Sequence, residues 1–387
     1  MLKRVQHDSI LKTTPQKLGK YMNKMPKLSF LIPAFNHEDF IKQCINSILT
    51  QNYKNVEVIV VDDCSSDKTA ERIKEIKDER LIFIQNSFNR GLNGNLNVAY
   101  KKATGDFISI IGSDDYFDQN YIQSFFDFIK TEGDDFTVFY PKIVHIDDFG
   151  NLIQNQPRFP ENKTNEDILK NLFLHGNFLG SPGMIMSKNS AKHIFPLDEG
   201  IHQHQDYIMH IQLLFLGKPA FMENVKVFYR IPTDTNGHMS SNCVKANKRV
   251  EIETPFAQNY FIKNIKTPQQ LTAIFGEMAT KYGEPKKETI AYFLARIALD
   301  ASHNRFLPVW GFRTLIEFLS QNGNQELLYK LYGFEYKDFS ALFGKVKLLD
   351  DFLHAQEKEF YSSTSWKITK PLRFFKDFFS KKRKNSK

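Results

Sequence analysis

Two adjacent carboxylates, Asp114 and Asp115, end an apolar run that is predicted to form a buried strand. From Gly105 to Asp118 the chain reads G-D-F-I-S-I-I-G-S-D-D-Y-F-D, so only small residues immediately precede the pair. Adjacent buried carboxylates repel each other and lose hydration, which is costly unless a hard cation or a donor group compensates. Mg²⁺ and Mn²⁺ are the usual compensating ions, because they prefer oxygen ligands. The pair therefore indicates a divalent-cation site, with an acidic turn as the alternative.

Two apolar runs upstream are predicted to position the residues that join this pair. Residues 28–32 and 56–61 are short, partly β-branched and bounded by Pro33 and Asp62, as expected of parallel strands buried on both faces. A helix is predicted between them from apolar residues at helical spacing, namely Ile41, Cys44, Ile45, Ile48 and Leu49. In open α/β sheets, ligands bind beyond the carboxyl ends of the strands. The polar tips of three strands should therefore converge on one crevice: Phe35, Asn36, Asp62, Asp63, Asp114 and Asp115.

Four motifs in register resemble glycosyltransferase family 2. They are P-A-F-N, V-V-D-D-C-S-S-D, N-R-G-L-N-G-N-L-N-V-A-Y-K-K-A-T-G-D-F and G-S-D-D, and the match covers residues 27–130. The resemblance implies an α/β protein with the GT-A fold, in which a Rossmann-like mixed sheet is flanked by helices. It also implies an enzyme that takes a sugar from a nucleotide-diphosphate donor, with Mn²⁺ or Mg²⁺ as cofactor.

By motif position, the resemblance implies a role for individual residues. Phe35 would stack on the nucleobase, and Asp63 would accept a hydrogen bond from the base. Asp114 would face the ribose and Asp115 would bind the metal, which offsets the charge that develops on the leaving diphosphate. The predicted nucleotide-sugar site is completed by Pro33, Asn36, Arg90 and Asn97.

Several of these residues also admit simpler interpretations. Phe35 could be an ordinary core aromatic, Asp62 and Asp63 could cap a helix, and Arg90 could be a solvated loop residue. Of the two aspartates, Asp62 is assigned to capping or support. The family often has a basic residue just before Asn97, where Leu96 stands here, so one diphosphate contact is missing from the motif.

The alternation of strands and helices fades after Tyr140, and the second half of the site depends on one further helix. That helix should begin near Asp206 and end at Gly217. It is predicted from the spacing of Ile208, Ile211, Leu214 and Phe215. In the family, the position of Asp206 carries the general base. The residue before it is usually Glu, whereas this chain has Gln205. Asp206 would take the proton from an acceptor hydroxyl in an inverting reaction, with a helix N-cap as the alternative.

Histidines near Asp206 raise the alternative of a zinc site. His202, His204 and His210 have spacings at which histidine can chelate, but a zinc ion needs three or four ligands that converge on one point. A loop with alternating histidines followed by one histidine on a helix does not ensure that convergence. Loop polarity explains these residues adequately.

The resemblance also implies a role for His238, near the end of the predicted GT-A domain. The stretch V-F-Y-R-I, followed by N-G-H-M-S-S-N, resembles the family's last strand and the loop that folds over the diphosphate. His238 would there bind the metal or the diphosphate, and Arg230 would offset phosphate charge. A surface role is an equal alternative for both.

The length of 387 residues and the residue patterns predict four regions. They are an N-terminal extension (1–26), the GT-A domain (27–243), a helical accessory region (244–360) and a basic, aromatic tail (361–387). Patterns such as A-Y-F-L-A-R-I-A-L and L-L-Y-K-L-Y in the third region suit packed helices, and this region has no catalytic signature.

The positive charge of the chain is concentrated in its tail. The formal net charge is +8, and residues 367–387 contain nine Lys or Arg and one Asp. Trp366 and four phenylalanines accompany these cations, so residues 366–387 are predicted to lie on an anionic membrane, where each cation contributes about 1 kcal/mol. A solvated tail is the alternative, and no nucleic-acid partner is expected. Similar S-W-K-I-T-K-P-L-R endings are frequent in family members that act on lipid-linked acceptors.

No apolar run is long enough to span a bilayer, and the first 26 residues lack the apolar core of a secretion signal. We therefore expect a cytoplasmic enzyme that lies peripherally on the cytoplasmic face of the inner membrane. Its predicted activity is inverting, metal-dependent transfer from a UDP-sugar to a glycan or lipid-linked acceptor in surface-polysaccharide or lipooligosaccharide synthesis. The alternatives are a sugar-nucleotide nucleotidyltransferase and a non-catalytic membrane-surface adaptor.

Overall fold

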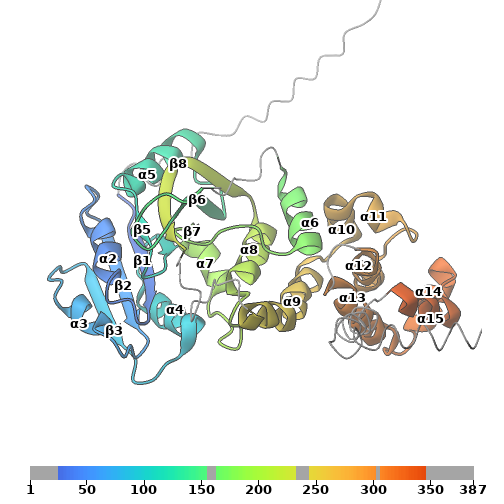
Figure 1. The fold of residues 1–387 in the computed structure, drawn as a ribbon. Helices are drawn as coiled ribbons and strands as arrows, with labels where there is room; N and C mark the ends of the chain where they lie inside the picture. The colour runs from blue at the N-terminus through green and yellow to red at the C-terminus, as the bar shows by residue number, and fades with distance from the viewer. Residues whose placement is uncertain (1–24, 155–162, 232–243, 302–305, 346–387) are drawn as a thin grey trace, which may run out of the picture. The chain divides into compact units, whose positions relative to one another are not determined.

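The computed structural model describes residues 25–154, 163–231, 244–301 and 306–345 (Figure 1). The chain divides into two compact units, with the boundary between Phe275 and Gly276. His238 and the predicted membrane-binding segment 366–387 lie outside the described residues, so the roles predicted for them stay predictions.

A mixed sheet forms the centre of the first unit. Its eight strands in the described residues follow the order β3-β2-β1-β4-β7-β6-β8-β5. Strands β1 to β4 pair in parallel, β7 is antiparallel to both of its neighbours, and β6 and β8 are parallel. The strands are β1 (Leu28–Ala34), β2 (Val56–Asp62), β3 (Leu81–Gln85), β4 (Phe107–Ile110), β5 (Tyr116–Phe117), β6 (Val138–Ile146), β7 (Ile185–Ser187) and β8 (Pro219–Arg230).

The predicted first strands and the helix between them are confirmed. Strands β1 and β2 are parallel, with Leu28 opposite Val56, and every position except Pro33 is buried. Side chains of a strand alternate between the two faces, so the even-numbered residues of β1 face one way. These pack with α2 (Ile41–Leu49) and α5 (Tyr121–Glu132), while α4 (Gly91–Lys102) also lies against β1 and β2. The five apolar residues that predicted α2 are all buried.

The alternation of elements that fades in the sequence after Tyr140 continues in the structure. Strand β6 is followed by α6 (Asn165–His175), β7, α7 (Lys188–Ile194), α8 (Gln205–Leu216) and β8. Strand β7 has only three residues, and residues 142–145 of β6 are half-buried, so neither strand carries a clear apolar pattern. The helix predicted to begin near Asp206 and to end at Gly217 is confirmed as α8, with Gly217 as its C-terminal cap.

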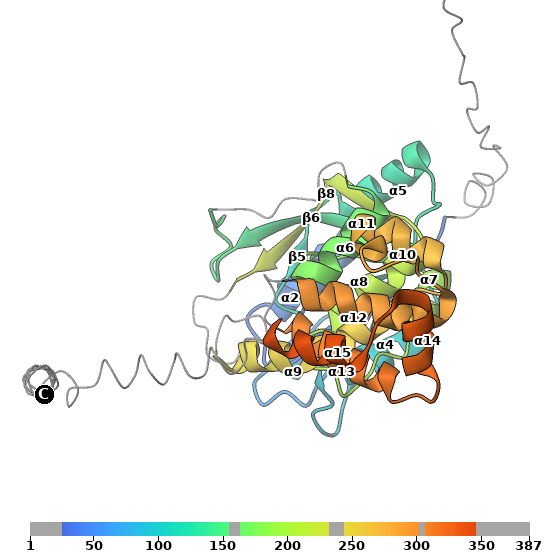
Figure 2. The same cartoon turned by 90° about the vertical axis from the view of Figure 1, so that its right-hand side faces the viewer.

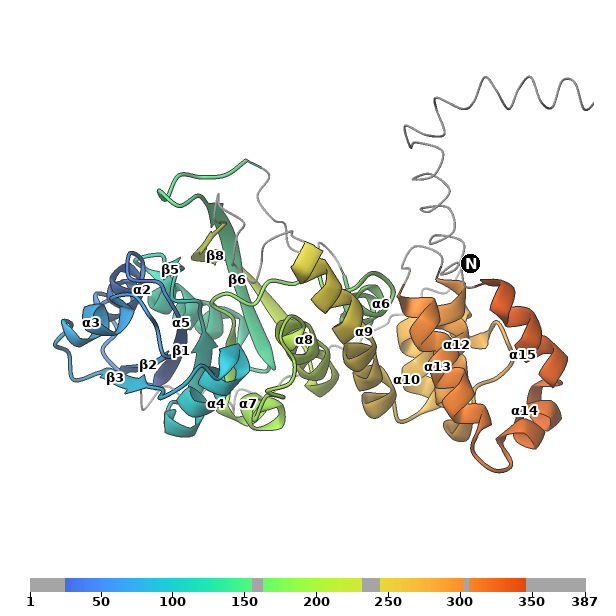
Figure 3. The same ribbon diagram turned by 60° about the horizontal axis from the view of Figure 1, so that its bottom comes forward.

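Two further helices complete the first unit. Helix α9 (Val244–Asn264) packs against α8, as Figure 3 shows, and α10 (Pro268–Phe275) packs against α6. In chain order, the short helix α3 (Thr69–Lys74) connects β2 to β3.

The second unit is helical in its described residues. Its helices are α11 (Glu277–Thr280), α12 (Ile290–Asp300), α13 (Leu307–Leu319), α14 (Asn324–Tyr332) and α15 (Tyr336–Leu342), with short 3₁₀ turns at Lys287–Thr289 and Phe343–Lys345. Helices α12 and α13 pack side by side (Figure 2), and Gly311 allows their close approach, because a Cβ there would lie 2.8 Å from the Ala295 carbonyl oxygen. None of the helices that the structure describes is both long and apolar enough to cross a bilayer.

Candidate functional site

The carboxyl ends of β1, β2 and β4 lie next to one another at one edge of the sheet. Ala34 is opposite Asp62, and the Asp63 backbone N–H donates to the Ala34 carbonyl oxygen at 2.8 Å. Beyond β4, the Ile111 N–H donates to the Leu31 carbonyl at 3.2 Å. The register of the parallel strands thus brings the residues that follow them to one edge, as the sequence predicts.

The turn after β1 exposes an aromatic ring at this edge. Phe35 is 45% exposed, so the alternative of a core aromatic does not describe it. The next residue, Asn36, has a positive φ of 53°, a conformation that asparagine tolerates better than most residues. Its side-chain oxygen accepts from the Ser66 N–H at 2.9 Å, and its own N–H donates to Ser65 Oγ at 3.0 Å. The turns after β1 and β2 are therefore fastened to each other.

Asp63 caps the start of α4. Its carboxylate accepts hydrogen bonds from the backbone N–H groups of Arg90, at 2.7 Å, and Gly91, at 2.8 Å. The Asn86 amide adds a third bond at 3.0 Å. A negative charge at a helix N-terminus is stabilising, so Asp63 fixes α4 relative to β2. Its neighbour Asp62 is buried inside the edge and accepts from Ser65 N–H at 3.3 Å, which fits the predicted supporting role.

The polar residues of α4 bind the chain segment 197–201. Asn97 accepts from the Leu197 N–H at 2.7 Å and donates to the Leu197 carbonyl at 2.9 Å. Arg90 pairs with Glu199 at 3.3 Å, and Asn93 donates to the Asp198 carbonyl at 2.7 Å. Asn97 and Arg90 were predicted to bind the nucleotide sugar, and that role stays a prediction. What they hold in this structure is the segment that leads to α8.

Asp114 and Asp115 form a pair of carboxylates that repel each other at this edge. Asp115 is 2% exposed, and burial, followed by repulsion from Asp114, raises the pKa of its carboxyl group well above the usual value. The two carboxylates close around Gly112, whose Cβ, if present, would lie 2.8 Å from Asp114 Oδ1 and 3.1 Å from Asp115 Oδ2. A side chain at position 112 would therefore displace the carboxylates.

Arg230, at the end of β8, is buried and donates hydrogen bonds to both residues of this pair. Its backbone N–H donates to Asp115 Oδ1 at 2.8 Å, and its Nε donates to the Asp114 carbonyl at 3.0 Å. Its Nη1 donates to the carbonyls of Asp147 and Asp148, both at 2.8 Å, and the guanidinium stacks on the Phe40 ring at 4.3 Å. The guanidinium thus donates its hydrogen bonds to groups within the protein. Its positive charge partly offsets the negative charge of Asp115.

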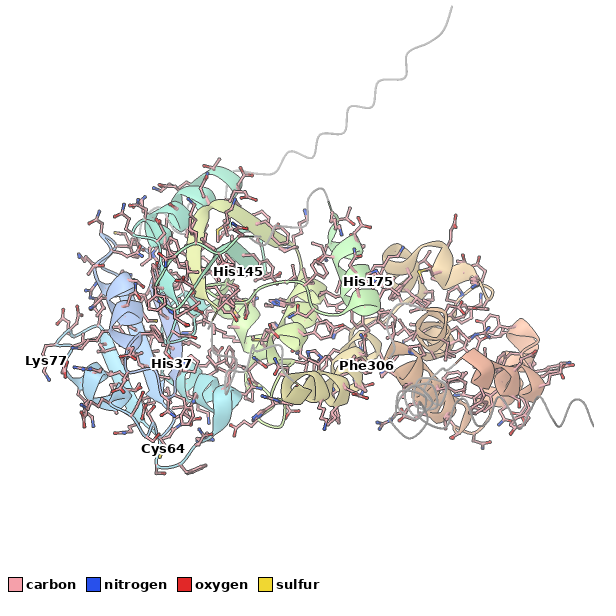
Figure 4. The ribbon with its side chains drawn as sticks, in the orientation of Figure 1. His37, Cys64, Lys77, His145, His175 and Phe306 are labelled. Atoms are coloured by element: carbon pink, nitrogen blue, oxygen red, sulfur yellow. The ribbon has the colours of Figure 1, made fainter. Side chains whose placement is uncertain are left out.

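His37 is a site residue that the sequence reasoning did not single out. Its Nδ1 lies 2.7 Å from Ser113 Oγ and 3.9 Å from Asp114 Oδ1. The residue is labelled in Figure 4 and comes from the turn between β1 and α2. The available signal was its position directly after the P-A-F-N motif, because that turn had already been assigned to the site.

The carboxylate pair fits a divalent cation that takes its other ligands from water and substrate. Among the residues that the structure describes, no three His, Cys, Asp or Glu side chains are grouped to hold a metal ion. Mg²⁺ is commonly bound through one or two carboxylates together with substrate phosphates, and Mn²⁺ takes the same oxygen ligands. Two carboxylates whose mutual repulsion is only partly compensated match that requirement.

Asp206 is the second residue of α8 and is not its N-cap, which is His204. Its Oδ1 accepts from the Tyr207 N–H at 2.7 Å and its Oδ2 from the Asn177 amide at 3.0 Å. The Asp206 residue is half-buried, so an acceptor hydroxyl can reach its carboxyl group. Burial raises the pKa of Asp206 to about 6, so the group can accept a proton near neutral pH. Asn177 carried no motif and was not predicted.

The histidines near Asp206 have separate roles in packing. His204 Nε2 lies 3.0 Å from Thr254 Oγ1, and buried His210 lies with its Nδ1 2.8 Å from the Tyr140 hydroxyl. Burial lowers the pKa of His210 to about 3, so it is neutral at physiological pH. The described residues contain no group that supports the zinc alternative.

The sequence of this chain is similar to those of known glycosyltransferases. Residues 29–195 match the family model described as "Glycosyl transferase family 2". An Escherichia coli UDP-Glc:alpha-D-GlcNAc-diphosphoundecaprenol beta-1,3-glucosyltransferase is 41% identical over 108 residues, which are 28% of this chain and 43% of that protein. A putative teichuronic acid biosynthesis glycosyltransferase of Bacillus subtilis is 27% identical over 231 residues, 59% of this chain and 86% of that protein. The first curated relatives are matched over less than half of their length.

Among solved structures, the fold is similar to that of Staphylococcus aureus TarS 1–349. The crystal structure of that protein in complex with UDP-GlcNAc has a TM-score of 0.51 and 20% sequence identity, and covers 79% of this chain and 91% of that one. At this identity the likeness shows the fold, which is the GT-A fold predicted from the sequence.

Proposed function

Because the chain belongs to glycosyl transferase family 2 through residues 29–195, we propose that it transfers a sugar from a UDP-sugar to a hydroxyl group of a lipid-linked glycan. The transfer inverts the configuration at the anomeric carbon and depends on a divalent cation. The product extends a cell-surface polysaccharide.

One observation carries the donor half of this proposal. Asp114 and Asp115 lie close together, one of them fully buried, at the sheet edge where Phe35 and Asp63 also lie. Protein folds seldom retain repelling buried carboxylates without a compensating role. A nucleotide diphosphate with a divalent cation supplies the missing positive charge, a ribose and a planar base.

The cation would be held by Asp115, with His238 as a further predicted ligand, while the neighbouring Asp114 would face the ribose. When bound, Mn²⁺ or Mg²⁺ supplies positive charge that stabilises the departing diphosphate. Phe35 contributes an exposed ring on which a uracil can stack. The buried Asp63 carboxylate accepts three hydrogen bonds within the protein and keeps acceptor capacity for the base N–H.

The acceptor half rests on Asp206. In the proposed reaction, a hydroxyl oxygen of the acceptor attacks the anomeric carbon while the bond from that carbon to the diphosphate oxygen breaks. Asp206 takes the hydroxyl proton, and the UDP leaves on the opposite face of the sugar, which inverts the configuration. A pKa of about 6 leaves the Asp206 carboxylate deprotonated and basic at neutral pH.

The class of acceptor is proposed from the relatives. The E. coli relative is named for a sugar linked through diphosphate to undecaprenol, and the B. subtilis relative for teichuronic acid synthesis. The first name gives a lipid-linked acceptor, and the second gives a role in polysaccharide synthesis. The basic, aromatic segment 366–387 would keep the enzyme at the cytoplasmic face, where such acceptors are exposed.

The test is UDP release from a panel of UDP-sugars by the purified full chain with Mn²⁺, with and without GlcNAc-diphosphoundecaprenol. We expect one donor to turn over, faster with the lipid acceptor, and the product to carry the inverted anomeric linkage by NMR. A retained configuration would refute the inverting mechanism, and no UDP release from any donor would refute the UDP-sugar assignment. GDP- and dTDP-sugars serve as controls for the base.

A further inference from the structure

A buried glutamate of α9 binds the backbone just before Asp206. The Glu253 carboxylate accepts hydrogen bonds from three consecutive N–H groups, those of His202 at 2.9 Å, Gln203 at 2.7 Å and His204 at 2.9 Å. Glu253 is only 7% exposed. Three N–H groups that point at one carboxylate form a strong, charge-assisted contact.

Two further residues of α9 extend this contact, Thr254 before Asp206 and Gln258 after it. Thr254 Oγ1 lies 3.0 Å from His204 Nε2, and the Gln258 amide donates to the Tyr207 hydroxyl at 3.0 Å. The Tyr207 hydroxyl in turn donates to the Leu172 carbonyl at 2.5 Å. One face of α9 therefore holds the residues on both sides of the proposed base.

Glu253 also places a negative charge next to the start of α8. The N-cap residue His204 makes no side-chain capping hydrogen bond. The first N–H groups of a helix have no partner inside the helix and carry partial positive charge. The Glu253 carboxylate places a negative charge just before this end and fixes the chain that enters it.

The segment in between connects the two halves of the site. Residues 197–201 are held by Asn93 and Asn97 of α4 and by its N-cap residue Arg90. The start of α4 is itself capped by Asp63. Residues 202–204 are the last link between this segment and α8. Glu253 therefore fastens the link that sets where the Asp206 carboxylate stands relative to the donor side.

We propose that Glu253 is a positioning residue for Asp206: it fixes the backbone of residues 202–204 and so sets the placement of the base against the acceptor hydroxyl. This inference rests on the proposed function of Asp206. It assigns a role in the reaction to α9. This helix lies in the region 244–360, where the sequence shows no catalytic signature.

The test compares Glu253→Gln with Glu251→Gln in the full chain. Glu251 lies two residues away on the same helix and is exposed, so it is a matched control. Turnover is measured as UDP release from the UDP-sugar found in the donor panel, and UDP affinity by calorimetry with Mn²⁺. A misplaced base should lower kcat by about 10- to 100-fold. The affinity for UDP should stay within about twofold, and Glu251→Gln should behave as the wild type.

A second pair of variants decides the matter if Glu253→Gln does not fold. Thr254→Val removes the contact with His204, whereas Thr254→Ser retains the hydroxyl. We expect a lower kcat for Thr254→Val, normal UDP affinity, and recovery in Thr254→Ser. Unchanged kcat in Glu253→Gln, or an equal loss of kcat and of UDP affinity, would overturn the positioning role.

Asp206→Asn separates this inference from the proposed function. If Asp206→Asn retains full turnover, Asp206 is not the base and both statements fail. If Asp206→Asn is inactive while Glu253→Gln is fully active, the proposed function stands and only the role of Glu253 is lost.

Discussion

The two edges of the sheet each contain buried carboxylates, but the protein treats them in opposite ways. At the amino edge, Glu57 of β2 accepts hydrogen bonds from Ser29 Oγ at 2.5 Å, Lys27 Nζ at 2.6 Å and the Thr104 N–H at 2.6 Å. Burial alone would raise the pKa of Glu57, but these bonds outweigh it and lower the pKa. At the carboxyl edge, the pKa of Asp115 is raised.

This difference separates a structural carboxylate from one that we propose to bind a cation. Glu57 is compensated by partners within the protein, so its charge stabilises the fold. Asp115 has one backbone N–H and the nearby charge of Arg230, but it also faces Asp114. A charge that the protein leaves undercompensated is available to a ligand, and polar groups that violate local optimality are expected at functional sites.

The strongest way to break this comparison is Asp115→Asn. The amide removes a buried charge and its repulsion with Asp114, so the thermal unfolding midpoint of the metal-free protein should stay the same or rise. Turnover of the UDP-sugar should fall by roughly 10²- to 10³-fold, because the charge that holds the cation is lost. Thermal unfolding and turnover are measured on the same preparation. A lower midpoint with retained turnover would make Asp115 a structural residue like Glu57.

The next largest effect is expected for Asp206→Asn, which should lower kcat by about 10²-fold or more without changing UDP affinity. The wild-type rate should rise with pH through about 6 and then level off, because only the deprotonated carboxylate is a base. Asn177 donates a hydrogen bond to that carboxylate and lowers its pKa. Asn177→Ala should therefore move the inflection to higher pH. An inflection that stays in place in Asn177→Ala would show that another group titrates.

Phe35→Ala tests whether the exposed ring at the carboxyl edge binds the base. Base–aromatic stacking is worth about 1–3 kcal/mol, so UDP should bind roughly 10-fold more weakly. The unfolding midpoint should change little, because nearly half of the Phe35 surface is already exposed. Phe149→Ala is the control, since Phe149 is 86% exposed in the turn after β6. Equal losses in both variants would argue against stacking on Phe35.

Glu57→Gln should have the smallest effect on turnover and a clear one on stability. Loss of the hydrogen-bonded charge should lower the free energy of unfolding by about 1–3 kcal/mol, with kcat unchanged. The folded-state pKa of Glu57 lies below its ordinary value of 4.5, so its contribution is present above that pH and is lost as the pH falls. Urea unfolding of wild type and variant at pH 7 and pH 3 measures both. An equal difference at the two pH values would contradict this assignment.

The convergence of the residues proposed to bind the donor could be predicted because they follow apolar runs. Phe35, Asp63 and Asp115 each come within a few residues after a strand, and parallel strands must bring their carboxyl ends together. The position of α8 could be predicted from its own spacing and from Gly217. Local pattern and chain direction are enough to place these residues at one edge.

The rest depends on contacts between residues far apart in sequence. Arg230 reaches Asp115 across 115 residues, and Asn97 reaches Leu197 across 100. Glu253 reaches the backbone before α8 from a helix with no motif. No local pattern encodes such pairs. From sequence alone, a polar residue on an amphipathic helix is expected to face solvent.

The most direct test of the account is calorimetric binding of UDP to the wild type and to Asp115→Asn, each with and without Mn²⁺. An undercompensated carboxylate pair predicts that Mn²⁺ strengthens UDP binding to the wild type and has no such effect on the variant. If UDP binds both proteins equally well whether or not Mn²⁺ is present, the pair does not bind a cation and the contrast between the two sheet edges has no functional meaning.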